Sequence, residues 1–507
     1  MAFLKPLFRA IELLLMKCLC STIVLFLLIV LFIDFLPISF GGYAAQRFLL
    51  LSISGSVVLV VGFGWLNPAR EASQSQVLWQ ALPGIFLAVL FFLLSFPYRF
   101  RPFNWIEPGM YAFYFLFIIL VGGRLAQLNR AERLVGAFIF LVAGACFFYG
   151  AMTINVYLFA ISGSVANLVN YIPWGFVNIR YWSHVATWLL PLLPLAVFIG
   201  PYKDNRLWKT GVALAAALWW WIVLMSSARG TMLGVGFGTL LVLLLIGRPS
   251  FPWLKVSAKY LLFGVCAWLL LSVLIPSILL DEVQIRSIKT GGSGRWPLFL
   301  EAFQMSIQNF PFGMGPQSWL THEIITEAYR NSPKFGHPHN MYLMWAAEYG
   351  WLLIAGLLVL VGQAAKNFWV KRTLIRSGQA PELALILAAF TASVSAALFH
   401  AGVSAVFMAP GSMLIGLLVL TLFWALVQPP VALVPPLTVR QRRGRTKIAL
   451  LVTAVVAVLC VVWLREVWHY YRAMEQDVEF YHEHASEGTL PRFWFHGNYP
   501  RHPSQMP

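Results

Sequence analysis

Charged residues are scarce in this sequence. Asp, Glu, Lys and Arg make up only 11% of its 507 residues, whereas 60% are hydrophobic and the mean hydropathy is +0.75. A typical soluble domain carries about 25% charged residues. Several apolar runs reach the roughly 20 residues that a helix needs to cross about 30 Å of hydrocarbon. The composition therefore excludes a soluble protein and indicates an all-α polytopic membrane protein.

Acidic residues are the scarcer of the charged groups. There are 19 Asp and Glu against 36 Lys and Arg, and the formal net charge is +17. An excess of this size can indicate nucleic-acid binding when the basic residues gather on one face. Here the Lys and Arg residues lie mainly in short loops between apolar runs. Membrane topology explains that distribution, and we expect no nucleic-acid partner.

Disulfide and metal-binding patterns are also missing. The cysteines lie inside apolar runs, where a thiol behaves as a small hydrophobe, and none shows disulfide or metal spacing. These cysteines are Cys18, Cys20, Cys146, Cys266 and Cys460. His482 and His484 stand near Glu479 and Glu483, but histidines two residues apart do not share a helix face. We therefore expect no metal site and no cofactor.

The apolar runs predict about 12 to 13 transmembrane helices. We place them at roughly 18–38, 48–66, 77–96, 108–126, 134–157, 183–200, 210–226, 230–247, 258–280, 350–368, 381–400, 404–427 and 447–464. The chain then divides into an N-terminus (1–17), helices one to nine (18–280), a large loop (281–349), helices ten to thirteen (350–464) and a tail (465–507).

Basic residues gather in alternate loops, as they do in cytoplasmic loops. They are Arg124, Arg130, Arg133, Lys203, Arg206, Lys209, Arg248, Lys255, Lys366, Lys371, Arg372, Arg376, Arg440, Arg442, Arg443, Arg445 and Lys447. All fall on the side of the N-terminus, which we therefore place in the cytoplasm. The large loop, the tail and the loops around Arg180 and Arg229 then share the periplasmic face, where we expect the chemistry.

The large loop is long enough to have structure of its own. Four apolar residues near its start recur at helical spacing and predict an amphipathic helix. They are Trp296, Phe299, Phe303 and Ile307. Leu320, Ile324 and Ala328 predict a second surface helix, and His339 is expected on the first turn of the next one. In the tail, the segment from Trp468 to Tyr481 is expected to rest on the membrane surface.

Five short motifs surround this loop in a definite order. They are Ser-Ala-Arg-Gly (227–230), Gly-Arg-Trp (294–296), Phe-Pro-Phe-Gly-Met-Gly (310–315), His-Pro-His-Asn-Met-Tyr-Leu (337–343) and Glu-Tyr-Gly (348–350). Across residues 210–370 this order resembles the shared signature of O-antigen ligases, O-antigen polymerases and related protein O-oligosaccharyltransferases. The first 170 residues and the tail match that superfamily only in hydropathy.

The resemblance implies a metal-independent glycosyltransferase of the bacterial inner membrane, which takes a glycan from undecaprenyl pyrophosphate at the periplasmic face. Members differ in the acceptor: a ligase uses lipid A-core, a polymerase another lipid-linked repeat unit, and an oligosaccharyltransferase protein hydroxyls. We place the ligase reaction of lipopolysaccharide biosynthesis first and keep the other two as alternatives. A polysaccharide transporter or flippase fits less well, because the chain does not show two similar halves. An envelope scaffold would not require the arginines and histidines considered next.

Cleavage of a sugar–pyrophosphate bond requires stabilisation of the departing diphosphate, and guanidinium groups offer fixed, multiple donors for it. Arg229 and Arg295 are the first candidates. An arginine in an apolar setting generally faces a cavity or a partner. The alternatives are snorkelling to headgroups for Arg229 and a surface charge for Arg295. Arg180 lies on the same face, either near the phosphates or as an interfacial anchor, and Arg286 completes the candidate set.

The acceptor hydroxyl is a poor nucleophile until a base takes its proton, and histidine is the usual base near neutral pH. His339 is our candidate, with a hydrogen-bonded structural imidazole as the alternative. His337 is second, to orient the acceptor or pair with a phosphate. Asn340 is expected to fix the local turn, and Glu348 to set a histidine tautomer or to cap or pair at the helix entrance. Structural or interfacial roles are assigned to His184, His322 and His400.

Overall fold

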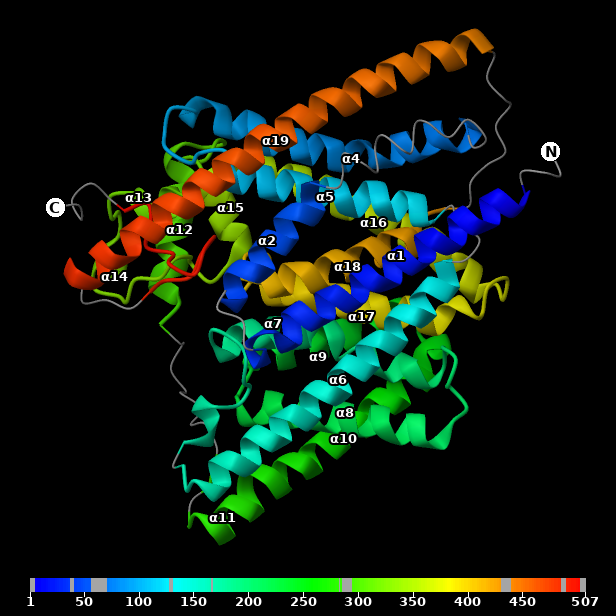
Figure 1. Cartoon of the computed structure of the whole chain (residues 1–507), viewed down its shortest axis with the longest axis vertical. Coiled ribbons are helices and arrows are strands. Elements are labelled where there is room, and N and C mark those ends of the chain that lie inside the picture. Colours follow the sequence, from blue (N-terminus) through cyan, green and yellow to red (C-terminus); the bar gives the residue numbers. More distant parts are fainter. Residues whose placement is uncertain are drawn as a thin grey trace.

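The computed structural model describes residues 5–36, 41–55, 71–126, 131–165, 167–281, 283–284, 294–429, 439–484 and 489–501. Within these ranges the secondary structure is helical and contains no strand. Long helices run side by side through the molecule, and the short helices α12 (Trp296–Gln308), α13 (Ser318–Thr321) and α14 (Glu327–Arg330) lie at one end of them (Figure 1). The all-α polytopic fold predicted from the sequence is confirmed.

Nine helices among the described residues are long and apolar enough to cross a bilayer. They are α4 (Glu71–Ser95), α5 (Ile106–Leu125), α6 (Ala131–Ser162), α8 (Arg206–Met225), α10 (Phe251–Trp268) with its extensions η8 (Leu269–Leu274) and α11 (Ile275–Leu279), α16 (Trp351–Arg376), α17 (Leu383–Ala401), α18 (Pro410–Val427) and α19 (Val439–His484). Two of the other four predicted runs fall on helices with shorter apolar stretches, α1 (Lys5–Phe32) and α9 (Arg229–Leu245). The run predicted at 48–66 begins on α2 (Gly42–Gly55), and its residues 56–66 lie outside the described residues. The run predicted at 183–200 begins on α7 (Ile179–Leu189).

The run predicted at 183–200 is not one continuous helix. α7 ends at Leu189, and the 3-10 turn η6 (Leu193–Val197) follows it. Pro191 and Pro194 lack the backbone N–H that an α-helix needs, so the helix cannot continue through them. α7 is therefore short, and it begins close to the residues that precede the loop helix α15 (Met341–Tyr349).

α9 and α17 approach each other closely because glycines line their contact. A Cβ atom at Gly234 would lie 2.7 Å from the backbone oxygen of Ala396, and one at Gly238 would lie 2.3 Å from that of Ala392. Larger residues there would push the two helices apart. The contact fixes the position of α9 and of its first residue, Arg229.

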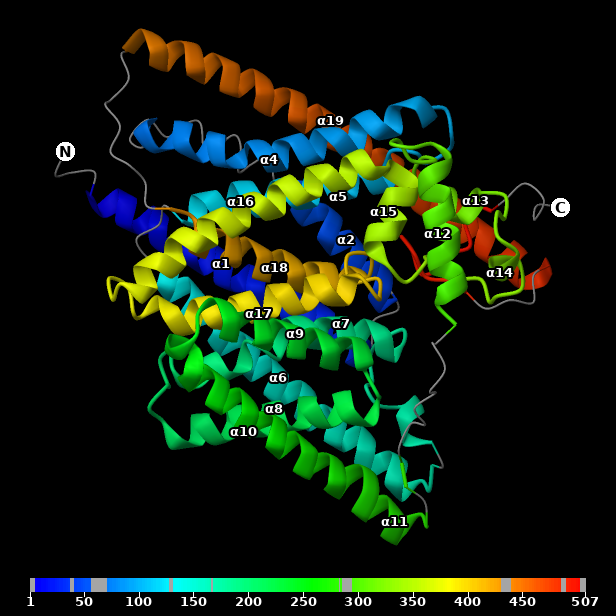
Figure 2. The same ribbon diagram turned by 180° about the vertical axis from the view of Figure 1, so that it is seen from behind.

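The loop helices form a small second core. Leu298 and Ala302 of α12 are buried in it, and α12 itself lies across the ends of the long helices rather than alongside them (Figure 2). The predicted helix is present, but most of its four regularly spaced apolar residues do not form the face that packs on this core. Trp296 is 70% exposed, and Phe303 and Ile307 also face outward. The buried face of α12 is thus rotated away from its most aromatic residues.

Glu301 of α12 explains both the rotation and the structure that follows it. Its buried carboxylate accepts the backbone N–H groups of Ile325 at 2.7 Å and Thr326 at 2.8 Å, and it lies 2.9 Å from Nε2 of His322. Because these contacts keep residues 323–326 out of a helix, the predicted second helix is wrong, and α13 and α14 replace it. His322 has a structural role here, as expected.

Residues 489–501, which we call the return loop, fold back against the end of α19. The segment from Trp468 to Tyr481 is part of α19 and does not form a separate surface segment. Tyr470 and Tyr481 are buried, and the Tyr470 hydroxyl donates to the backbone oxygen of Tyr499 at 2.9 Å. The return loop therefore lies at the same end of the molecule as the loop helices (Figure 1).

Candidate active site

A cavity of about 180 Å³ lies at the end of the molecule that carries the loop helices. Four parts of the chain line it: the start of α7, the residues before α15, the turn between α17 and α18, and the return loop. The lining residues are Asn178, Arg180, Tyr181, His184, Phe335, Gly336, His337, His339, Ser404, Ala405, Thr489, Leu490 and Pro491. Three of the predicted site residues, Arg180, His337 and His339, therefore border one space.

His339 lies directly before α15 and not in its first turn. The helix begins at Met341, and Asn340 is its N-cap, whose Oδ1 accepts the N–H groups of Tyr342 at 3.0 Å and Leu343 at 3.1 Å. The φ angle of His339 is +58°, a left-handed conformation that is uncommon for a residue with a side chain. Backbone strain of this kind gathers at functional sites, where the surrounding structure holds it in place.

The two histidines of this segment contact each other. The backbone N–H of His339 donates to Nδ1 of His337 at 3.1 Å, and their ring centroids stand 4.3 Å apart. Burial, together with the positive charges of Arg492, Arg180 and Arg295, lowers the pKa of His337 to about 3. His337 is therefore neutral near pH 7, and one of its ring nitrogens is committed to the backbone of His339.

Arg180 contacts His339 directly, with its Nη1 donating to the imidazole Nε2 at 3.3 Å. Because a guanidinium can only donate, Nε2 must carry a lone pair and Nδ1 the hydrogen. Burial of the ring disfavours a second proton, and so do the nearby His337 ring and the positive charges of Arg180 and Arg295. Together they hold the pKa of His339 well below its ordinary value. His339 is thus a neutral imidazole with a proton-accepting nitrogen beside a cation.

Two more of the predicted arginines, Arg295 and Arg229, lie near Arg180 and the two histidines. Arg295 stands directly before α12, and Arg229 is the first residue of α9. Burial and the positive charges of Arg180 and Arg229 lower the pKa of Arg295 to about 10. Like charges act on one another in this way at short range. The structure therefore brings together arginines from α7, α9 and α12, whereas Arg286 lies outside the described residues.

Glu348 makes no hydrogen bond with His337 or His339. Its two carboxylate oxygens lie 2.6 and 2.7 Å from Nη2 of Arg492, and Oε1 also accepts the N–H of Trp319 at 3.1 Å. Glu348 is therefore an ion-pair partner and not the residue that sets a histidine tautomer. It lies near the end of α15, far along the helix from Asn340.

Sequence reasoning missed Arg492 and its second partner, Glu107. Arg492 donates through Nε and Nη2 to the Glu107 carboxylate at 2.8 and 3.0 Å. Each is an isolated charge in an apolar or aromatic stretch, and such a charge needs a partner. That signal marks both residues but does not pair them, because 385 positions separate them along the chain.

His184 and His400 hold α7 in place. Nε2 of His184 lies 2.7 Å from Oγ of Ser404, and Nδ1 of His400 lies 2.8 Å from Oγ1 of Thr187. Both therefore have the structural roles expected of them, although His184 also borders the cavity. Their effect on the site is indirect, because they fix the helix that carries Arg180.

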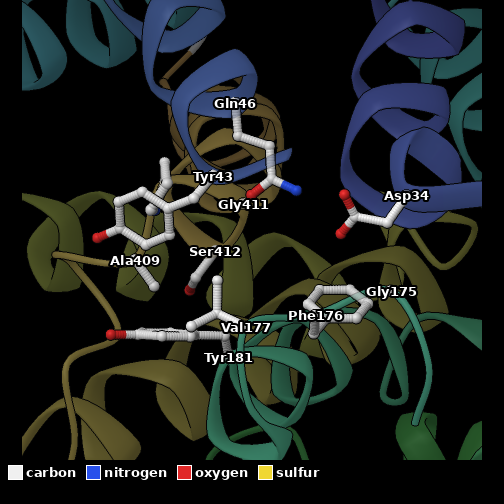
Figure 3. A pocket seen from close by; sticks show the side chains of 11 residues that line it. Asp34, Tyr43, Gln46, Gly175, Phe176, Val177, Tyr181, Ala409, Gly411 and Ser412 are labelled. Atoms are coloured by element: carbon white, nitrogen blue, oxygen red, sulfur yellow. The ribbon is translucent and has the colours of Figure 1, made fainter. Parts of the chain in front are cut away.

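A second hollow adjoins the first and is shown in Figure 3. Tyr181 borders both hollows, and Asp34, Tyr43 and Gln46 face the second. Its volume of about 20 Å³ is room for a single water molecule. We therefore assign no substrate to it.

The cavity is suited to an anion next to a weak base. Arg180 lines it, and Arg229 and Arg295 lie close enough for the charges of Arg180 and Arg229 to lower the pKa of Arg295. Guanidinium groups provide planar, multiple donors of the kind that bind phosphate oxygens. Among the residues described, no three His, Cys, Asp or Glu side chains come together in a group that could hold a metal ion. The titratable side chains that border the cavity include Arg180, His337 and His339.

Comparison with known proteins adds one finding. Residues 213–358 match the family model described as O-antigen ligase. The match runs from within α8 into α16 and includes Arg229, Arg295, His337 and His339. It confirms the resemblance to the O-antigen ligase and polymerase superfamily. A search of curated proteins finds no match.

Proposed function

From the match of residues 213–358 to the O-antigen ligase family, we propose that the chain transfers a glycan from undecaprenyl pyrophosphate to a hydroxyl of lipid A-core. One observation carries the proposal. His339 presents a proton-accepting nitrogen to Arg180 in a cavity whose electrostatics also involve Arg295. A base and an anion site in the same small space are what a hydroxyl and a lipid diphosphate require.

The arginines receive the leaving group. A departing diphosphate gains negative charge as the sugar–oxygen bond breaks, and Arg180, Arg229 and Arg295 are the groups that offset it. Guanidinium groups do this by direct hydrogen bonds, so the reaction needs no metal ion. The mutual repulsion of these arginines, which lowers the pKa of Arg295, is relieved when an anion binds among them.

The donor also prepares the base. Positive charges from Arg180 and Arg295 contribute to the low pKa of His339 in the free protein. A bound diphosphate offsets both charges, so the pKa of His339 rises toward its ordinary range. Arg180 then turns from Nε2 to the phosphate oxygens and leaves that nitrogen free to accept a proton.

In the transfer step, His339 takes the proton and the diphosphate takes the electron pair of the bond that breaks. The acceptor hydroxyl gives its proton to Nε2 of His339, and its oxygen forms a bond to the anomeric carbon. The bond from that carbon to the diphosphate oxygen breaks, and its electron pair leaves with the diphosphate. The protonated imidazole and the charged leaving group remain close together until the products separate.

The acceptor is tested by deletion of the gene. We expect the deletion strain to lose all polymer from lipid A-core while polymer still builds up on its carrier, as shown by the lipopolysaccharide band pattern. A core capped by a single repeat unit would instead favour the alternative O-antigen polymerase. Unaltered lipopolysaccharide would favour the second alternative, a protein O-oligosaccharyltransferase.

The orientation of the site is tested by labelling. The positive loops support a cytoplasmic N-terminus and a periplasmic loop 281–349 in the inner membrane. We expect a membrane-impermeant thiol reagent to label Ser332→Cys in intact spheroplasts and Ser377→Cys only after lysis. Ser332 lies in the loop before α15 and Ser377 follows the last residue of α16, so the α16 span separates the two positions. Labelling of Ser332→Cys only after lysis would rule out a periplasmic site.

A further inference from the structure

The return loop is a compact unit held by its own contacts. The N–H of Leu490 donates to Oδ1 of Asn498 at 2.7 Å, and the N–H of Arg492 donates to the backbone oxygen of Trp494 at 3.0 Å. A Cβ atom at Gly497 would overlap the backbone oxygen of Leu490, at 1.4 Å. The loop therefore closes on itself only because position 497 is a glycine.

Arg492 joins the return loop to α5 and α15 through ion pairs. Glu107 of α5 and Glu348 of α15 both pair with it, and all three side chains are almost wholly buried, with Arg492 only 1% exposed. Burial by itself lowers the pKa of Arg492, but the two carboxylates raise it well above its ordinary value. The guanidinium is therefore always charged, and it neutralises carboxylates that have no access to water.

The backbone of the loop is held from the opposite side by α2. Arg47 donates through Nε to the carbonyl of Phe493 at 2.7 Å and through Nη2 to that of Arg492 at 3.2 Å. The hydroxyl of Tyr43 also donates to the Arg492 carbonyl. Arg47 itself is fully buried. The return loop is thus fixed by α2, α5 and α15 together.

The same loop supports the segment that carries the histidines. Nη1 of Arg492 donates to the carbonyl of Gly336 at 3.2 Å. A Cβ atom at Gly336 would lie 2.8 Å from the Leu490 oxygen and 2.9 Å from the Pro491 oxygen, so the two backbones are in direct contact. Gly336 precedes His337, whose Nδ1 in turn accepts the N–H of His339. Two hydrogen bonds and the peptide bond between Gly336 and His337 connect Arg492 to His339.

Thr489, Leu490 and Pro491 also line the cavity itself. These residues carry no charge, whereas Arg180 stands elsewhere in the lining. A lipid-linked glycan has a charged diphosphate and uncharged sugar rings with apolar C–H faces. The diphosphate matches the arginines, and the sugar matches the wall made by the return loop.

We propose that the return loop is part of the active site, in which Thr489, Leu490 and Pro491 contact the sugar next to the bond that breaks and Arg492 is a positioning residue for the His337–His339 segment. The inference rests on the proposed function, because it assumes a glycan substrate. It assigns a substrate-contacting role to a segment outside the matched residues 213–358.

The proposed sugar contact at Thr489, Leu490 and Pro491 is tested by placing a larger side chain in this part of the cavity lining. We expect Leu490→Trp to lower kcat/KM for glycan transfer at least 10-fold, mainly through KM for the glycan-bearing donor, while the thermal unfolding temperature stays unchanged. Phe495→Trp is the matched control, since Phe495 belongs to the same loop but faces outward. A short lipid pyrophosphate without sugar should bind Leu490→Trp as it binds the wild type. Equal kcat/KM for Leu490→Trp and Phe495→Trp would overturn the assignment of the wall.

Positioning by Arg492 is tested by Arg492→Lys, which keeps one charge but cannot donate to Glu107, Glu348 and Gly336 at once. We expect kcat per folded molecule to fall at least 10-fold with KM for the donor within about twofold, and diethylpyrocarbonate to modify His339 faster. Arg501→Lys is the control, because Arg501 of the return loop pairs with Asp477 of α19 and neither residue lines the cavity. A purely structural role would reduce the yield of folded protein but not kcat per folded molecule.

The histidine labelling separates failure of this inference from failure of the proposed function. It needs no substrate and can be followed even if the wild type transfers no glycan. An inactive wild type with faster labelling in Arg492→Lys would reject the function and keep the positioning contact. An active wild type with unchanged labelling and kcat in Arg492→Lys would reject the positioning role alone.

Discussion

Replacement of His339 by alanine is expected to lower the rate of glycan transfer by about 10²- to 10⁴-fold, the usual effect of removing a general base. The ring borders the cavity, and its Nε2 is the nitrogen that would receive the acceptor proton. Donor binding should change little, because the diphosphate contacts are made by arginines. The measurement is transfer in vitro with purified donor and acceptor, and added EDTA should leave the wild type active.

His482→Ala is the matched control, since His482 is exposed on α19 and does not line the cavity. Its activity should equal that of the wild type. Thermal unfolding in detergent shows whether a loss in His339→Ala comes from the site or from the fold. Near wild-type turnover in His339→Ala would move the role to His337 or away from histidine altogether.

The pH profile of the wild type gives a second measurement of the same role. kcat/KM reports the free enzyme, in which the pKa of His339 is well below its ordinary value, so this residue adds no acid limb near pH 6. kcat reports the donor complex, in which the diphosphate has raised that pKa. Activity requires the neutral imidazole, so it is lost as pH falls through the raised pKa. We therefore expect an acid limb at higher pH in kcat than in kcat/KM, and its absence in both would contradict activation by the donor.

Arg229→Lys and Arg295→Lys are expected to lower activity roughly 10-fold or more each, although both keep the positive charge. Hydrogen bonds to a charged group contribute about 1.5–3 kcal/mol, and lysine cannot reproduce the fork of donors that a guanidinium offers. The loss should appear in kcat more than in expression or insertion. Turnover at saturating donor, normalised to folded protein, is the quantity to compare.

Arg248→Lys serves as the control for these two variants. Arg248 is exposed and follows the opposite end of α9, so its geometry should not affect the reaction. Wild-type turnover in both Arg229→Lys and Arg295→Lys would mean that charge alone suffices and would remove the proposed bidentate contacts.

Much of the helical architecture could be predicted from the sequence because hydrocarbon imposes one solution. A backbone in lipid must satisfy its own hydrogen bonds, so every long apolar run becomes a helix. The break at Pro191 and Pro194 can also be read from the sequence, because each proline lacks the N–H group that a helix needs. Hydropathy alone does not register that missing group. Outside the apolar runs this constraint disappears.

The loop helices show what hydropathy cannot decide. Trp296 and Ile307 look like core residues by spacing, yet they face outward, while the acidic Glu301 is buried. The carboxylate is buried because backbone N–H groups of Ile325 and Thr326 satisfy it. Such partners come from another segment of the loop, and no periodicity within α12 reveals them.

In the candidate site, too, some residues could be identified from the sequence, whereas their contacts could not. The resemblance pointed to Arg229, Arg295, His337 and His339, and the contact of Arg180 with His339 unites two separate loops. The left-handed backbone of His339 and the pairing of Arg492 with two carboxylates depend on three-dimensional contacts. A single sequence identifies isolated charges as costly but does not say which of them meet.

The return loop also sets the order in which the protein can mature. Arg492 pairs with Glu107, which is synthesised 385 positions earlier, and with Glu348, which is synthesised 144 positions earlier, so both carboxylates are made well before their cation. The wall of the cavity is added only after α19 has crossed. A chain without the return loop would hold Arg180, His337 and His339 but would lack one part of the cavity lining. The active site that we propose is therefore complete only once the return loop has packed against α5 and α15 during biogenesis.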